Sequence, residues 1–186
     1  MVYNLVMVEI DSQFIKPEAI LSQIGLQPGM QVADFGCGSG YFALLAARIT
    51  GSRGKVYAVD VQKSVLEQVK KEARLQNIVG IEIIWSDIET VGAAKIPPHS
   101  LDMVFIVNTL FQAKNKLAVF TEARRMMKPG GSLLVVDWLP GDTALGPPVA
   151  NRLDLGKIKA LANSAGFVFQ KDINAGSHHF GLLFQS

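Results

Sequence analysis

An acidic residue followed by three glycines at alternate positions is the feature of this chain most suggestive of chemistry. Asp34 lies within an apolar run that is predicted to be a strand, and Gly36, Gly38 and Gly40 come next, just before a predicted helix. Glycine adopts positive φ and lets a ligand approach the backbone, and the first amides of a helix point toward that ligand. The spacing therefore predicts a strand-to-helix turn that binds a ligand carrying an adenosine.

Two features of this turn argue against a bound pyrophosphate. A dinucleotide-binding loop has its third glycine three residues after the second, where this chain has Tyr41. The Asp34 carboxylate would repel a phosphate, whereas it suits an ammonium or sulfonium group. A nicotinamide oxidoreductase is therefore the weaker interpretation, and a tight turn without any ligand is the structural alternative.

A second acidic residue, Asp60, ends the apolar run Lys55–Asp60 about twenty residues beyond the glycines. A carboxylate at the carboxyl end of a strand can accept hydrogen bonds from both hydroxyls of a ribose, and ligands of open parallel sheets bind at these strand ends. We predict this role for Asp60. Because a helical run follows, helix capping is the alternative.

The glycine run resembles the first motif of class I S-adenosylmethionine-dependent methyltransferases. The Lys-Pro-Gly-Gly run at 128–131 adds to the resemblance, which extends from about Phe14 to Phe184. The Gly-Pro-Pro, Arg-Leu and Ala-Gly-Phe runs toward the carboxyl end resemble a small prokaryotic-type group related to methyltransferases of quinones and other small molecules. The resemblance implies S-adenosylmethionine as cofactor, S-adenosylhomocysteine as product and no metal.

The resemblance also implies where the cofactor is held. Asp87, after the run Ile81–Trp85, would face the exocyclic amine of adenine, with Ile88 against the ring, although an acidic residue here is also typical of a turn. Asn108, after the run Leu101–Val107, would contact the methionine moiety through its backbone. The predicted cofactor-binding residues are Asp34, Gly36, Cys37, Gly38, Ser39, Gly40, Asp60, Val61, Asp87, Ile88 and Asn108.

No catalytic residue can be assigned from the sequence. Many small-molecule methyltransferases have a histidine where this chain has Phe111-Gln112, and the Asn-Pro-Pro-Tyr run of nucleobase methyltransferases is missing. Polar candidates near the methyl group are Gln112, Asp137 and the pair His178-His179. One histidine is a hypothetical general base, because the pKa of histidine is near neutrality; ordinary surface or edge histidines are the alternative.

Aromatic side chains could contact the sulfonium through cation-π interactions. The candidates are Tyr3, Phe14, Phe35 and Tyr41. Phe35 is expected in the core, whereas Phe14 precedes the first helix, where related enzymes close an amino-terminal segment over the cofactor. Phe14 is therefore the preferred candidate.

Strands and amphipathic helices alternate along the chain, which predicts a parallel sheet covered on both faces. Pro129 is expected to stop a helix, and the glycines after it to turn the chain into a fifth strand. Only a short turn at 174–177 separates the last two predicted strands, Phe167–Gln170 and Phe180–Phe184, so they should form an antiparallel hairpin. Helices are expected over Pro17–Ile24, Tyr41–Ile49, Val65–Gln76, Lys116–Met127 and Leu155–Ala165.

These elements predict an α/β fold, a Rossmann-like doubly wound seven-stranded sheet that is mostly parallel with an antiparallel last strand. With 186 residues, about half of them apolar, the chain is expected to form one domain, 1–186. Within it, 1–28 is expected to close over the cofactor, and the long stretch 139–153, rich in proline and glycine, to form a lid loop.

Composition limits the partners and the compartment. The formal net charge of +2 offers no basic stripe for nucleic-acid phosphates, so nucleic acid is not the expected partner. The single cysteine, Cys37, allows no internal disulfide and no cysteine-cluster metal site, which is consistent with a reducing compartment. We expect neither a secretory signal nor a membrane span, and hence a cytoplasmic protein. The oligomeric state stays open.

The expected activity is methyl transfer to a small molecule by in-line displacement at the methyl carbon. A base is needed only if the acceptor must lose a proton before or during attack. Two alternatives remain: methylation of RNA or protein, and a catalytically silent S-adenosylmethionine-binding subunit of a larger complex. The second is kept because no base can be identified.

Overall fold

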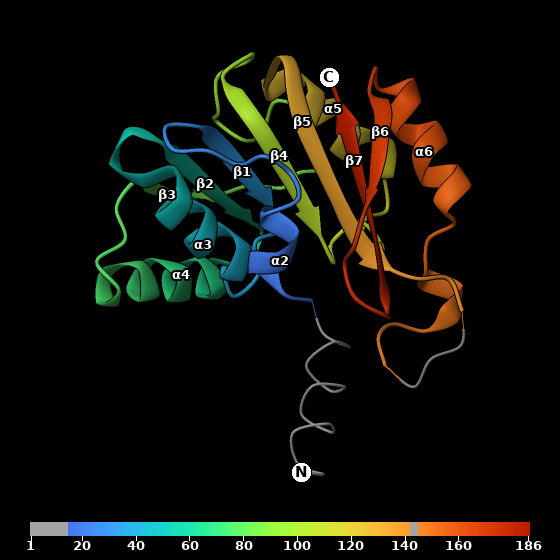
Figure 1. The fold of residues 1–186 in the computed structure, drawn as a ribbon, viewed down its shortest axis with the longest axis horizontal. Coiled ribbons are helices and arrows are strands. Elements are labelled where there is room, and N and C mark those ends of the chain that lie inside the picture. The colour runs from blue at the N-terminus through green and yellow to red at the C-terminus, as the bar shows by residue number, and fades with distance from the viewer. Residues whose placement is uncertain (1–14, 142–144) are drawn as a thin grey trace.

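A computed structural model of the chain describes residues 15–141 and 145–186, which form a sheet with helices on both faces (Figure 1). The strands are β1 (Gln31–Phe35), β2 (Lys55–Asp60), β3 (Ile81–Trp85), β4 (Leu101–Val107), β5 (Met127–Trp138), β6 (Val168–Ile173) and β7 (His179–Gln185). The α-helices are α2 (Pro17–Leu21), α3 (Tyr41–Thr50), α4 (Lys63–Leu75), α5 (Lys116–Met126) and α6 (Leu155–Ser164), and short 3-10 turns are η1 (Gly51–Arg53) and η2 (Val149–Asn151).

The seven strands lie in the order β3-β2-β1-β4-β5-β7-β6. The first five are parallel, whereas β7 is antiparallel to both β5 and β6. This confirms the predicted doubly wound sheet with its terminal hairpin. The strand order reverses between β1 and β4, and the crevice beyond such a reversal is where open α/β sheets bind ligands.

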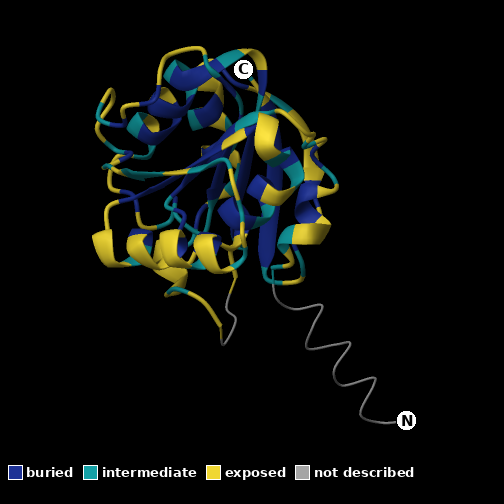
Figure 2. Ribbon diagram, turned by 90° about the vertical axis from the view of Figure 1, so that its left-hand side faces the viewer, coloured by how far each residue is buried: buried dark blue, intermediate teal, exposed yellow. Residues whose placement is uncertain are grey.

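Both faces of the central strands are buried, which explains their nearly continuous apolar sequences. Along β4, Val104 and Ile106 belong to the apolar cluster beneath α5 and α6, whereas Met103 and Phe105 belong to the cluster beneath α2, α3 and α4. Figure 2 shows the result as dark-blue strands between helices whose outer sides are yellow. The sheet is thus held rigidly, and the ends of its strands are fixed relative to one another.

The helix ends ahead of Pro129 in the Lys-Pro-Gly-Gly run at 128–131, as predicted, but the predicted separate turn before the fifth strand is wrong, because the run already belongs to β5. Helix α5 ends at Met126, and β5 already begins at Met127, whose φ of −78° and ψ of 140° are extended. Pairing with β4 shifts from Leu101↔Met127 to Met103↔Ser132, so the run is an irregularity within β5. A residue before proline is driven toward extended backbone, which ends the helix ahead of the proline.

Within the described ranges, 15–141 and 145–186, no helix combines the length and the apolar character needed to cross a bilayer. The predicted helix ends agree with the structure to within three residues, and β6 and β7 are longer than predicted. This extension places His179 inside β7, paired with Trp138 at the carboxyl end of β5.

Candidate functional site

A cavity of about 710 Å³ lies at the carboxyl ends of β1, β2, β3 and β4. It is lined by residues of four separate strand ends, because parallel strands bring their carboxyl ends to one edge of the sheet. Every predicted cofactor-binding residue lines it except Gly40. The lining residues that sequence reasoning did not assign to the cofactor are Ile15, Pro17, Tyr41, Phe42, Gln62, Ser86, Glu89, Val107, Thr109, Gln112 and Ala113.

The three glycines of the loop have different structural roles. All have positive φ: 70° at Gly36, 50° at Gly38 and 81° at Gly40. A Cβ on Gly36 would lie 2.5 Å from the Thr109 side chain, and one on Gly40 would lie 2.8 Å from Val69. A Cβ on Gly38 would meet nothing within 4 Å. Gly36 and Gly40 are therefore required by packing as well as by φ, whereas Gly38 is required by its φ alone.

The carboxylate of Asp60 organises this loop. Asp60 is 8% exposed, and its Oδ2 accepts a hydrogen bond from the backbone N–H of Gly38 at 3.1 Å. Its Oδ1 accepts from the backbone N–H of Gln62 at 2.9 Å, a turn contact at the start of α4. Since an ionised carboxylate offers about four acceptor positions, both oxygens keep capacity for a ligand in the cavity.

Burial sets the electrostatics of the cavity floor. Burial raises the pKa of Asp34 to about 7, a hydrogen bond from the backbone of Ala43 opposes the rise, and the charge of Asp60 adds to it. Burial, together with the charges of Asp34 and Asp60, raises the pKa of the Cys37 thiol well above its ordinary value. Cys37 is therefore protonated at neutral pH and has no nucleophilic thiolate.

The wall contributed by the end of β3 differs in detail from the expectation for Asp87. Its Oδ1 accepts from the backbone N–H of Glu89 at 2.8 Å, and its Oδ2 lies 3.3 Å from the hydroxyl of Thr90. Both oxygens thus stabilise the turn that Asp87 begins, which was the structural alternative for this residue. Ile88 is 7% exposed and lines the cavity beside it.

The wall at the end of β4 is constrained by Asn108, a non-glycine residue with φ of 50°. Its backbone N–H donates to Val136 O at 2.9 Å, and its carbonyl accepts from Gln112 Nε2 at 3.3 Å. The next residue, Thr109, donates its hydroxyl to Val107 O at 2.9 Å and lies 3.3 Å from Gly36 O. These bonds connect the β4 end to the glycine loop.

Among the polar candidates for catalysis, Gln112 lines the cavity, whereas Asp137, His178 and His179 do not. The buried Asp137 carboxylate accepts from the backbone N–H groups of Phe111 at 3.1 Å and Trp138 at 2.8 Å, and burial raises its pKa to about 6. Asp137 therefore ties the segment after β4 to the end of β5.

The ring of His179 is buried and lies 4.1 Å from the ring of Trp138, centroid to centroid. Burial, and secondarily the neighbouring His178, lowers the pKa of His179 to about 4. His179 is thus uncharged at neutral pH. The role of either histidine as a general base stays a hypothesis.

The four aromatic side chains considered for contact with the sulfonium lie in different places: one in the core, one at the cavity, and two outside the described residues. Phe35 is fully buried, as expected, and Tyr41 is 74% exposed at the cavity. Tyr3 and Phe14 lie outside the described residues.

The predicted lid, 139–153, is described except for 142–144, and none of its described residues lines the cavity. The Arg152 guanidinium donates to the carbonyls of Pro147 at 3.0 Å, Leu145 at 2.7 Å and Gly141 at 2.5 Å. The described part of this loop is therefore organised around Arg152, and its function as a lid stays a prediction.

Across the part of the chain that the structure describes, no three His, Cys, Asp or Glu side chains are grouped so that they could hold a metal ion. The cavity instead combines backbone donors, four carboxylates (Asp34, Asp60, Asp87 and Glu89) and apolar walls. Such a lining suits an adenosine-containing ligand with a cationic portion near Asp34.

Comparison with known proteins agrees with this interpretation. Residues 26–164 match a family model described as a methyltransferase domain. The ubiquinone/menaquinone biosynthesis C-methyltransferase UbiE of Shewanella pealeana is 31% identical over 119 residues, which cover 63% of this chain and 46% of that protein. UbiE of Cupriavidus necator is 29% identical over 128 residues, which cover 67% of this chain and 51% of that protein. The chain thus spans about half the length of these relatives.

Solved structures share the fold over nearly the whole chain. The crystal structure of a SAM dependent methyltransferase from Aquifex aeolicus aligns with a TM-score of 0.85 and 25% sequence identity. The alignment covers 92% of this chain and 90% of that one.

Proposed function

Since the chain belongs to the methyltransferase domain family, we propose that it uses S-adenosylmethionine to methylate a small-molecule acceptor. The observation that carries the proposal is that the glycine loop, Asp60 and the segment at Asn108 meet in one cavity. These three features come from different strands, and each suits a different part of the same cofactor.

In this proposal, Asp60 accepts hydrogen bonds from the ribose hydroxyls, and Ile88 packs against the adenine. The methionine portion lies toward Gly36, Asp34 and Asn108. The unobstructed space at Gly38, where even a Cβ would meet nothing, lets the cofactor approach the loop backbone closely. Because both Asp87 oxygens already accept hydrogen bonds, adenine recognition relies on remaining lone pairs and on backbone groups of the same turn.

S-adenosylmethionine supplies the activated methyl group on its sulfonium. The chain's own residues need to align the acceptor with that methyl group and exclude water, and orientation alone contributes several kcal/mol to lowering such a barrier. Gln112, held by its bond to the Asn108 carbonyl, is the polar side chain best placed to orient an acceptor from the β4 side. Tyr41 faces the same cavity from the start of α3.

Two observations favour a small-molecule acceptor. The formal net charge of +2 provides little attraction for nucleic-acid phosphates. The relatives that match in sequence are described as ubiquinone/menaquinone biosynthesis C-methyltransferases, which act on small molecules by that description. A quinone-like acceptor is therefore the first class to test. Methylation of RNA or protein has no specific observation in its favour.

The proposal is tested first by calorimetric titration of the wild-type chain and Asp60→Ala with S-adenosylmethionine, S-adenosylhomocysteine and NAD. We expect micromolar binding of the first two ligands, lost in the variant. Binding of NAD alone would contradict the proposal. Incorporation of labelled methyl from S-adenosylmethionine into metabolite extracts then tests transfer, with RNA extracts in parallel. Binding without transfer to any extract would favour the silent subunit.

A further inference from the structure

The connection between β3 and β4 carries one wall of the cavity and has no regular secondary structure. It begins with Ser86, Asp87, Ile88 and Glu89, all of which line the cavity, and continues to Ser100. Irregular backbone packed against a domain still needs partners for its N–H and carbonyl groups. The conformation of this wall therefore depends on whatever satisfies the residues that follow it.

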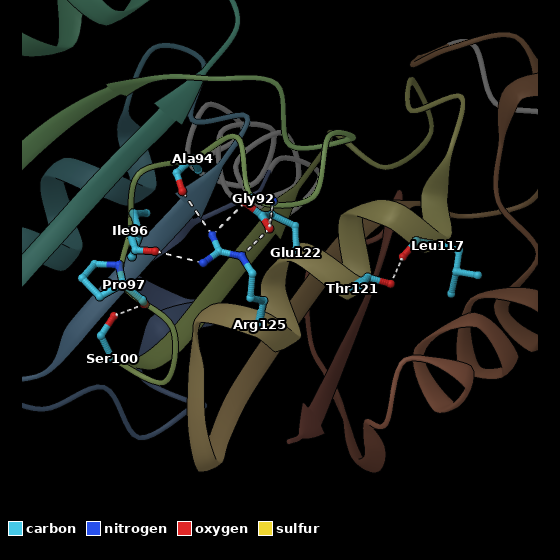
Figure 3. A network of polar contacts seen from close by, with 9 residues as sticks. All are labelled: Gly92, Ala94, Ile96, Pro97, Ser100, Leu117, Thr121, Glu122 and Arg125. Carbon is cyan, nitrogen blue, oxygen red and sulfur yellow. Dashed lines mark hydrogen bonds and ion pairs between the residues drawn. The ribbon is translucent and has the colours of Figure 1, made fainter.

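Two side chains of α5, Glu122 and Arg125, supply those partners (Figure 3). The backbone N–H of Gly92 donates to Glu122 Oε2 at 2.8 Å. The Arg125 guanidinium donates to Ala94 O at 3.1 Å and to Ile96 O at 3.2 Å. The same guanidinium pairs with Glu122 through two bonds, of 2.8 Å from Nε and 3.0 Å from Nη2. One ion pair thus holds three backbone groups of 92–96.

Moving the two charges of this ion pair out of water costs free energy, which its hydrogen bonds to the backbone of Gly92, Ala94 and Ile96 help to offset. The Glu122 side chain is fully buried, and that of Arg125 is 25% exposed. Replacing a buried ion pair by apolar residues of similar volume is often neutral or stabilising, so such a pair is weak evidence for added stability. The hydrogen bonds that Glu122 and Arg125 make with three backbone groups of 92–96 instead favour one conformation of the segment between β3 and β4.

A second contact, separate from the ion pair, links the start of α5 to the cavity wall. The backbone N–H of Asn115, which caps the start of α5, donates to Glu89 Oε2 at 2.5 Å. Glu89 is in turn bonded through its backbone N–H to Asp87. The connection is therefore bonded to α5 or its N-cap at both ends of 89–96, and the cavity-lining residues 86–89 end at the first of these attachment points, Glu89.

We propose that Glu122 and Arg125 are positioning residues, which set the affinity for the cofactor by holding 89–96 so that 86–89 forms the adenine-side wall. They do not line the cavity, so they act on the ligand only through this segment. The cofactor readout rests on the function proposed above, whereas the conformation of the segment can be measured without any ligand.

The decisive variants are Arg125→Lys and Glu122→Gln. Lysine keeps the charge but cannot reach two carbonyls and Glu122 at once, because it lacks the planar fork of arginine. Glutamine keeps an oxygen for Gly92 N–H but loses the charge. The matched control is Lys128→Met, which removes the 2.6 Å ion pair with Asp102 near the amino ends of β4 and β5, whereas the cavity lies at the carboxyl ends of the strands.

We expect Arg125→Lys to raise the Kd for S-adenosylmethionine by about tenfold, the equivalent of one net buried hydrogen bond. Glu122→Gln should raise it less, and Lys128→Met should leave it within about twofold. Amide hydrogen exchange in ligand-free protein should be faster across 87–96 in Arg125→Lys and unchanged there in Lys128→Met. With an identified acceptor, KM for the cofactor should rise while kcat is retained.

Failure of the two proposals is distinguishable. If the wild-type chain does not bind S-adenosylmethionine, the proposed function is wrong, and hydrogen exchange across 87–96 still decides the positioning role. If the wild type binds but both variants match Lys128→Met in affinity and exchange, the positioning role is wrong. Failure of both variants to fold would also overturn it, because the pair would then support the whole domain rather than this wall.

Discussion

The Asp60 carboxylate accepts a hydrogen bond from the backbone N–H of Gly38, with Oδ2 and N 3.1 Å apart. The end of β2 therefore holds the glycine loop that follows β1, so the ribose and methionine ends of the proposed cofactor site are set by one side chain. A single substitution at Asp60 is expected to affect both ends.

Asp60→Asn should weaken binding of S-adenosylmethionine by about tenfold to a hundredfold, since hydrogen bonds to a charged acceptor contribute about 1.5–3 kcal/mol each. The amide retains the shape of the carboxylate but has one acceptor oxygen instead of two. Calorimetry measures the loss, and Asp102→Asn, near the amino end of β4 and outside the cavity lining, is the control. Unchanged affinity in Asp60→Asn would exclude the carboxylate as the ribose ligand.

Affinity for S-adenosylmethionine should depend on pH through Asp34. Burial raises the pKa of this residue to about 7 in the ligand-free protein. A cationic ligand favours the ionised carboxylate and lowers its pKa, so binding releases a proton and affinity rises as the pH increases through about 7. We expect tighter binding at pH 8 than at pH 6 in titrations of the wild type.

The matched variant for this pH dependence is Asp34→Asn, which cannot ionise. Its affinity should be weaker than that of the wild type at pH 8 and nearly independent of pH between 6 and 8. A pH dependence of equal size in the variant would assign the effect to another group.

Gly36→Ala should destabilise the protein by about 3 kcal/mol, because its methyl group would overlap Thr109 and its backbone would keep a positive φ. Thr109→Ala removes the two side-chain atoms that lie 2.5 Å from the added Cβ. The double variant should therefore be more stable than Gly36→Ala, although less stable than wild type, since the backbone strain persists. Urea unfolding of all four proteins measures this coupling; strictly additive losses would contradict it.

The buried imidazole of His179 should make stability depend on pH below neutrality. Its folded-state pKa is about 4, against an ordinary value of 6.5. Between these values the unfolded chain binds more protons, so this contribution to stability is lost as the pH falls from 6.5 toward 4. The loss is on the order of 3 kcal/mol in the free energy of unfolding.

His179→Phe isolates this contribution, because Asp34 and Asp137 titrate alike in both proteins. The stability of the variant relative to wild type should increase between pH 7 and pH 4.5 in urea unfolding. A constant difference across that range would contradict the depressed pKa.

Much of the fold and of the candidate site is predictable from the sequence because the relevant signals are local. Alternate glycines after Asp34 impose positive φ at a strand end, and Asp60 closes the next apolar run. Continuous apolar strands alternating with helices then require a parallel sheet, and a parallel sheet brings its strand ends to one edge. The sequence by itself thus determined which residue types meet at the cavity.

Tertiary structure alone decided which partners these residues have. Asp87 uses both oxygens within its own turn, and the 128–131 run lies within β5 instead of forming a turn ahead of it. The bonds from Arg125 to Ala94 and Ile96 span 31 and 29 positions of the chain. Contacts over such separations depend on how α5 packs on the sheet, and no local pattern of residue types encodes that packing.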